Sequence, residues 1–146
     1  MARSDFSLIH RLRVRFSEVD RQGIAHNSMH LVYFGVGMNE YFRGLGFDRF
    51  AADAENGTAM HVVQATVSYK APILLDEEID IACRVAKLGR SSLTFVYEVF
   101  RAGSDLVLAS GDQVWVNTHR ASHSSTAWPE AFRTVLRARE PGLIES

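Results

Sequence analysis

A single long apolar helix pattern followed by a run of strand patterns most restricts the fold of this chain. Residues 29–45 carry apolar side chains at the spacing of a helix that is covered on one side or most of the way round. Residues 60–119 then read as a meander of long antiparallel strands. One helix can bury its apolar face against such a meander only if the sheet curls around it. The sequence therefore predicts an α+β protein with a curled antiparallel sheet wrapped around one long central helix.

The predicted strands begin before the helix. Residues 7–16 alternate, with Leu12, Val14 and Phe16 on the side expected to be buried and arginines on the other side. Later strands are expected at residues 60–69, 78–88, 91–101 and 106–119. A short helical piece is expected within 47–57 and a terminal helix within 128–140. Asn27 or Ser28 is expected to cap the long helix, and Gly46 to end it.

Length and composition exclude several classes of protein. A chain of 146 residues with 47% hydrophobic residues fits one folded domain spanning residues 1–146, rather than a disordered segment. The formal charge of −1, from 16 basic and 17 acidic residues, predicts no nucleic-acid or membrane partner. The single Cys83 cannot form an internal disulfide, which favours a reducing compartment. With no apolar run long enough for a signal peptide or a bilayer span, the sequence predicts a soluble cytoplasmic protein.

One acidic residue lies where chemistry is expected. Asp20 ends the first strand pattern, Gly23 follows it, and the pair His26-Asn27 leads into the helix. The start of a helix has backbone N–H groups without partners and a partial positive charge. A carboxylate beside such donors suits attack on a carbonyl group whose oxygen gains negative charge. Asp20 could instead cap a loop turn with its own side chain, as aspartates often do.

The order of these pieces resembles the 4-hydroxybenzoyl-CoA thioesterase branch of the hotdog-fold superfamily. The resemblance runs from about Leu8 to Pro129, and the order and spacing of its motifs carry it. The motifs are RVRFSEVD ending at Asp20, Gly23, the pair His26-Asn27, the helix ending in RGLG, VSYKAPILLDEEI, the turn KLGRSS and the strand VWVNTH. The resemblance implies a hotdog fold, hydrolysis of an acyl-CoA thioester and assembly into homodimers or homotetramers built as dimers of dimers.

The resemblance also assigns roles around the helix start. It implies that Asp20 is the catalytic carboxylate, acting as nucleophile or as general base. Backbone N–H groups near His26 and Asn27 are the implied oxyanion donors. Gly23, Ile24 and Ala25 are expected to approach the helix start closely and to border the substrate.

Further substrate contacts are expected from one helix position and one turn. His30 falls where relatives usually carry Tyr, which leaves the acyl-group specificity open. Lys87, Arg90, Ser91 and Ser92 belong to a turn that should lie near the coenzyme A path, since Lys, Arg and backbone donors bind phosphates well. The same turn could equally be a solvated hairpin. In the resembling family the site lies between subunits, so the helix and the turn could come from different chains.

Two glycines interrupt the helix pattern, and each costs roughly 1 kcal/mol relative to Ala. The favoured explanation for Gly35 and Gly37 is close packing of the helix on the sheet; room for an acyl chain is the compatible alternative. Many relatives place a glutamate at the position of Gly35. Its absence here leaves Asp20 as the better candidate for the catalytic carboxylate.

Other chemistries lack their signatures. His26 and His30 have the four-residue spacing of a zinc pair, but HNSMH lacks the glutamate of H-E-x-x-H and no third ligand is evident, so neither metal nor cofactor is expected. There is no Gly-x-Ser-x-Gly elbow and no phosphate-binding loop. The leading hypothesis is therefore an acyl-CoA thioesterase. The alternative is a non-catalytic module of the same fold that binds acyl-CoA or acyl-carrier protein.

Overall fold

The computed structural model describes residues 1–146 as one sheet with helices on its concave side and at its ends. The helices are α1 (Met29–Leu45), α2 (Arg49–Asn56) and α3 (Glu130–Arg139), with short 3₁₀ turns at Arg3–Asp5 and Phe16–Glu18. The strands are β1 (Leu8–Arg13), β2 (Thr58–Tyr69), β3 (Glu78–Leu88), β4 (Ser92–Arg101), β5 (Val107–His119) and β6 (Ile144–Glu145). None of the helices has both the length and the apolar character that a bilayer span requires.

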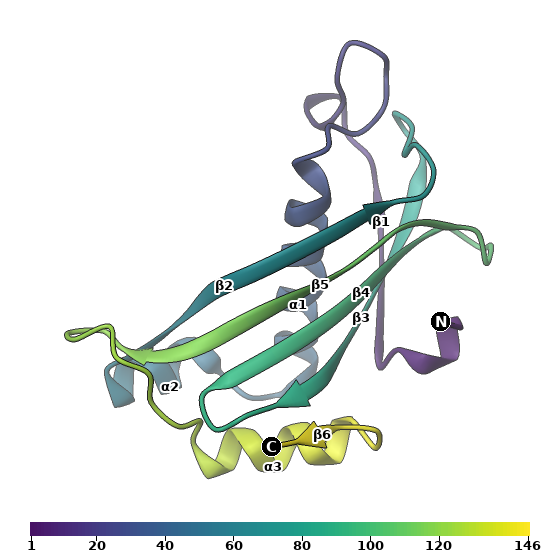
Figure 1. Ribbon diagram of the computed structural model, residues 1–146. Helices are drawn as coiled ribbons and strands as arrows, with labels where there is room; N and C mark the ends of the chain where they lie inside the picture. The colour runs from purple at the N-terminus through teal and green to yellow at the C-terminus, as the bar shows by residue number, and fades with distance from the viewer.

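The sheet has the strand order β1-β3-β4-β5-β2, with antiparallel neighbours throughout, and β6 adds a short parallel pairing to β3. It curls across α1, so that the long helix lies along its concave face (Figure 1). The predicted α+β hotdog arrangement is therefore confirmed. β2 lies at one edge of the sheet and has β5 as its only neighbour.

Aromatic side chains of α1 fill the space between helix and sheet. Phe34 stacks on Tyr97 of β4 with ring centroids 4.4 Å apart, and Tyr41 meets Phe95 edge to face at 5.3 Å. Cys83 of β3 is fully buried in the same core, and burial raises the pKa of its thiol. These contacts fix α1 along its length, which in turn fixes where its first residues lie.

The two helix glycines differ in their surroundings. A Cβ on Gly37 would lie 2.8 Å from Cγ2 of Ile81, so this glycine lets α1 approach β3 closely. A Cβ on Gly35 would meet nothing within 4 Å. The close-packing explanation is thus right for Gly37 and wrong for Gly35. Gly46 ends the helix with a φ of +70°, as predicted.

The first strand is shorter than the alternating pattern predicted. β1 ends at Arg13, and Phe16 is 82% exposed instead of buried. The physical reason is the 3₁₀ turn Phe16–Glu18, in which the Glu18 carboxylate accepts the backbone N–H of Arg15 at 2.9 Å. Val14 still points into the core, but the turn rotates Phe16 out to solvent.

The N-terminal segment packs on the sheet, where Arg3 contacts the buried carboxylate of Asp80. Asp80 of β3 accepts hydrogen bonds from the guanidinium groups of Arg11 and Arg3, each at 2.8 Å, and its side chain is only 3% exposed. Phe6 packs beside it on Phe100 with ring centroids 6.4 Å apart. The hydrogen bonds from Arg11, and then those from Arg3, lower the pKa of Asp80 to about 2 despite its burial.

This pair predicts an acid-sensitive contribution to stability. Because the folded pKa of Asp80 lies below its unfolded value, the stabilisation is complete above pH about 4 and is lost as the pH falls through about 2. Asp80→Asn should lower the free energy of unfolding at neutral pH by about 2 kcal/mol. Urea unfolding at several pH values checks this, with Asp105→Asn as the control because the side chain of Asp105 is 94% exposed. If the difference in free energy of unfolding between Asp80→Asn and wild type stays constant down to pH about 2, the prediction is contradicted.

Candidate active site

A cavity of about 500 Å³ opens at the start of α1, where the loop after β1 meets the end of β2. In Figure 1 this loop lies beyond the first turn of α1, close to the connection between β2 and β3. The cavity brings together most of the residues predicted for the helix start. Its lining is Asp20, Ile24, Ala25, His26, Asn27, His30, Tyr69, Lys70, Ala71, Pro72 and Ile73.

Asp20 both caps a turn and lines this cavity. Its Oδ1 accepts the backbone N–H of Gln22 at 2.8 Å, and its own N–H donates to the carbonyl oxygen of Ile24 at 2.8 Å. Gly23 completes the turn with a φ of +77°, in the left-handed region that favours glycine. No group of the chain donates to Oδ2, so one carboxylate oxygen is left for a ligand. The turn-capping role considered for Asp20 is therefore confirmed, and its catalytic role stays a prediction that the free oxygen permits.

A second loop holds the Asp20 turn in place. The N–H of Ala25 donates to the carbonyl of Ile73 at 2.7 Å, and the N–H of Leu75 donates to the carbonyl of Gly23 at 2.9 Å. Gly23 itself makes no close approach, since a Cβ there would meet nothing within 4 Å. Sequence reasoning missed this clamp because two irregular segments pair through their backbones and leave no periodic pattern.

Glu18, a buried carboxylate, anchors the other side of the loop. Besides the N–H of Arg15, it accepts the Arg15 guanidinium at 2.7 Å and the hydroxyl of Tyr33 from α1 at 3.1 Å. Burial tends to raise the pKa of Glu18, but the hydrogen bonds from Arg15 and Tyr33 outweigh it and lower the pKa. The Glu18 carbonyl also accepts the N–H of His26 at 2.9 Å. The sequence signal for this anchor is an acidic residue three positions after an arginine, a spacing too common to single it out.

Backbone donors at the helix start lack partners, and one of them, the N–H of Asn27, belongs to a residue that lines the same cavity as Asp20. The N–H of Asn27 donates to no group in the chain, whereas the N–H of Met29 donates to the carbonyl of His26 at 2.8 Å. His26 precedes the helix, and its Nδ1 lies 2.8 Å from the hydroxyl of Ser28. The four-residue spacing of His26 and His30 would place both on one helix face, but only His30 lies on the helix. Ser28 occupies the N-cap position but caps no N–H with its side chain.

His30 and Tyr69 lie side by side at the cavity, His30 buried and Tyr69 56% exposed. His30 is 4% exposed, and its ring meets that of Tyr69 edge to face with centroids 4.7 Å apart. Burial lowers the pKa of His30, and the carbonyls of Asn27 and His26 offset this only partly. The imidazole is therefore neutral at neutral pH. The Tyr69 hydroxyl donates to the carbonyl oxygen of Asn27 at 3.0 Å.

The turn of residues 87–92 lies at the other end of the molecule. Its Gly89 carbonyl accepts the guanidinium of Arg133 on α3 at 2.6 Å, and α3 packs near the last turns of α1 through Phe132 and Phe42. Figure 1 shows this turn beside α3, away from the Asp20 loop. Within one chain the turn therefore does not meet Asp20. A contact of Lys87, Arg90, Ser91 and Ser92 with substrate stays a prediction that requires a second chain.

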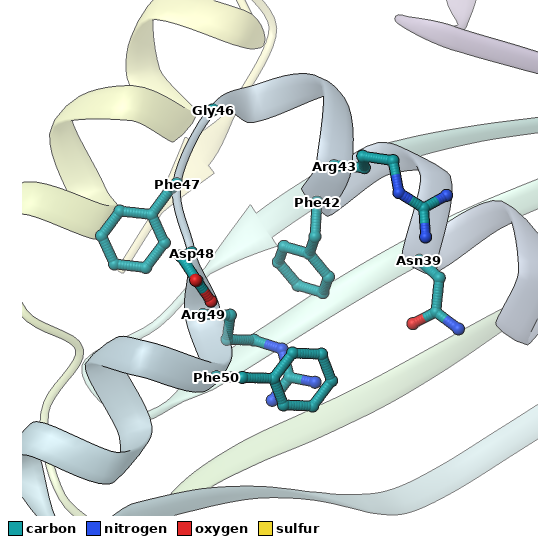
Figure 2. Close-up of a pocket in the computed structure, with 8 residues that line it drawn as sticks. All are labelled: Asn39, Phe42, Arg43, Gly46, Phe47, Asp48, Arg49 and Phe50. Atoms are coloured by element: carbon teal, nitrogen blue, oxygen red, sulfur yellow. The ribbon is translucent and has the colours of Figure 1, made fainter.

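A second cavity of about 480 Å³ lies at that end, between α1 and α2 (Figure 2). Its charged groups are already matched within the chain. Asp48 accepts the N–H of Ala51 at 3.0 Å, and Arg49 pairs with Asp53 at 3.0 Å while lying over the ring of Phe50. Asp48 caps the start of α2, whereas the cavity at the start of α1 holds the predicted Asp20, His26 and Asn27 together, which makes that cavity the better candidate for chemistry.

A helix wrapped by a curled sheet, with a carboxylate-bearing loop at its start, defines a hotdog-fold protein. The sequence pattern of the family described as the thioesterase-like superfamily matches residues 14–136, and the chain belongs to this superfamily.

Named relatives agree with this assignment. The chain is 26% identical to an Escherichia coli acyl-CoA thioester hydrolase, YbgC, over 66% of its length and 71% of the relative's. Its structure matches a Thermus thermophilus thioesterase solved with coenzyme A and Zn at 29% identity and a TM-score of 0.77, covering 94% of this chain and 96% of that one. A DHNA-CoA thioesterase from Staphylococcus aureus, at 22% identity with a TM-score of 0.80 over 94% and 96% of the two chains, shares the fold.

Proposed function

We propose that this protein hydrolyses an acyl-CoA thioester to a free acid and coenzyme A. The observation that carries the proposal is the single cavity in which a free Asp20 oxygen and the unpartnered N–H of Asn27 both lie at the start of α1. A thioester placed there would have, at its carbonyl carbon, a carboxylate that can attack or can activate water. Its carbonyl oxygen would have a hydrogen-bond donor. Membership of the thioesterase-like superfamily supports the same activity.

Two routes use the same carboxylate. As a nucleophile, Asp20 bonds to the carbonyl carbon, the C–S bond breaks, the thiolate leaves, and water hydrolyses the resulting mixed anhydride. As a general base, Asp20 takes a proton from water while the water oxygen bonds to the same carbon; the C–S bond of the tetrahedral intermediate then breaks, and the leaving thiolate takes up a proton. In both routes negative charge develops on the carbonyl oxygen, and the N–H of Asn27 is the donor we assign to it. Loss of one such donor typically costs about 3 kcal/mol of barrier.

Coenzyme A is the thiol carrier we assign, and the relatives' names support this choice. One is named an acyl-CoA thioester hydrolase, and the Thermus thermophilus thioesterase was solved with coenzyme A. That structure also contains zinc, but no three His, Cys, Asp or Glu side chains of this chain converge to hold a metal ion. The proposal therefore routes no step through a metal.

A panel of acyl-CoA thioesters, followed with a thiol-detecting dye, tests the proposal. Release of free thiol at a rate proportional to the protein concentration supports hydrolysis. The second candidate function is a binding module, which the turn-capping hydrogen bond from the Gln22 N–H to the Asp20 carboxylate favours. Tight binding of the same thioesters without thiol release would replace the proposed function with this one.

We also propose that two chains pair through β2. This strand is one of the two edges of the sheet, β1 being the other, and its exposed side chains include Val62 and Val63, at 48% and 62%. An exposed apolar edge strand favours pairing with another chain. Sedimentation equilibrium should give two or four times the chain mass, and Val63→Lys should shift the protein toward monomer. Ile144→Lys is the control, as Ile144 is 59% exposed on β6; a monomeric wild type would contradict the proposal.

A further inference from the structure

The edge strand β2 ends in a side chain that reaches the helix start. Tyr69 is the last residue of β2, paired with Ala109 of β5, so its backbone is fixed by the sheet. Its hydroxyl donates to the carbonyl oxygen of Asn27 at 3.0 Å, and its ring packs edge to face on the buried His30. Tyr69 therefore contacts two residues of the cavity from an element outside the loop and helix.

The Tyr69 hydroxyl is hydrogen-bonded to the Asn27 carbonyl at 3.0 Å, and the same carbonyl also acts on the buried imidazole of His30. The Asn27 N–H has no acceptor, its side chain has no partner, and its carbonyl accepts no backbone N–H from α1. The regular helical ladder begins only at Met29. The peptide group that carries the Asn27 N–H is held on its other side by the His26 carbonyl, which accepts the N–H of Met29 at 2.8 Å, and the Tyr69 hydroxyl holds the following peptide group. The Asn27 N–H belongs to the peptide group before the one that Tyr69 contacts. Its orientation relative to that group is set by the φ and ψ angles of Asn27.

We propose that Tyr69 is a positioning residue that holds the Asn27 backbone so that its N–H points at the thioester oxygen. This inference rests on the proposed function, because it concerns the donor assigned there. Tyr69 need not touch the reacting atoms. Small misplacements of a catalytic group, on the order of 1 Å, can lower the rate by up to about 100-fold, so loss of one hydroxyl can be measured.

Tyr69→Phe removes only the hydroxyl and keeps the ring contact with His30. We expect kcat for an acyl-CoA thioester to fall about 10-fold, while KM stays within about 2-fold, because a positioning contact acts on the transition state. The ¹⁵N order parameter of the Asn27 amide should fall from the range of rigid backbone, about 0.85, toward about 0.6. This second readout needs no substrate.

The matched control is Tyr97→Phe. Tyr97 is buried in the core, does not line the cavity at the start of α1, and donates to Oε1 of Gln113 at 3.0 Å. It loses the same kind of hydrogen bond, so it reports the effect of lost stability alone. An unchanged kcat or an unchanged Asn27 order parameter in Tyr69→Phe overturns the inference, as does an equal loss of kcat in the two variants. If the wild type releases no thiol, the proposed function fails, and the order parameter alone decides whether Tyr69 holds Asn27.

Discussion

Asp20→Asn is expected to lower kcat/KM for thioester hydrolysis by about 100- to 10,000-fold, the range for loss of a positioned catalytic acid or base. The fold should be unaffected, since an asparagine Oδ1 can still accept the N–H of Gln22 that Asp20 accepts at 2.8 Å. The substitution therefore removes the charge and leaves the turn. Thiol release by wild type and variant, measured at equal concentrations of folded protein, checks the prediction.

Asp105→Asn provides the matched control. Its carboxylate is almost fully exposed, at 94%, in the turn between β4 and β5. We expect its activity to equal that of the wild type. Equal turnover by Asp20→Asn and wild type would dismiss Asp20 as the catalytic group, and a loss of activity in Asp105→Asn would point to a nonspecific effect of charge.

The second large effect is expected on stability, from Gly111→Ala. A Cβ on Gly111 would lie 2.3 Å from the backbone oxygen of Thr66 on β2 and 2.6 Å from the ring of Phe34 on α1. Neither the paired strand nor the stacked ring can move freely, so the free energy of unfolding should fall by about 3 kcal/mol. In a chain of this length that corresponds to a decrease in Tm of roughly 6–12 °C. Thermal and urea unfolding measure it.

Gly35→Ala is the control for Gly111→Ala. A Cβ on Gly35 meets nothing, and the residue lies in the middle of α1. Alanine there should stabilise the protein by up to about 1 kcal/mol through helix propensity. If Gly111→Ala lowers the free energy of unfolding and Gly35→Ala raises it, the result supports the close packing of the sheet against α1. Equal, small effects would mean that β5 does not lie as close to Phe34 as the structure places it.

Much of the fold could be predicted because regular elements leave periodic patterns. The start and end of α1 and the bounds of β3 follow from such patterns and from Gly46. The end of β1 could not be predicted, since the turn at Phe16–Glu18 depends on one carboxylate folding back onto Arg15. Alternation alone continues the strand through Phe16, and only the tertiary contact ends it.

The sequence could predict the segment that carries the candidate site, but not the residues from other parts of the chain that line the cavity with it. Asp20, His26 and Asn27 are close in sequence, so a local pattern suffices to group them. The contacts from Tyr69 and Ile73 come from residues more than forty positions later, and they depend on where β2 ends and how its loop returns. The separation of the turn at residues 87–92 from Asp20 likewise follows only from the strand order.

The most direct test is a structure with a bound, non-hydrolysable acyl-CoA analogue. The account predicts the analogue's carbonyl carbon within about 3.5 Å of a carboxylate oxygen of Asp20. Its carbonyl oxygen should lie about 3 Å from the N–H of Asn27. An acyl group seated instead in the cavity between α1 and α2 (Figure 2), with the Asp20 carboxylate facing only its own turn, would contradict the account.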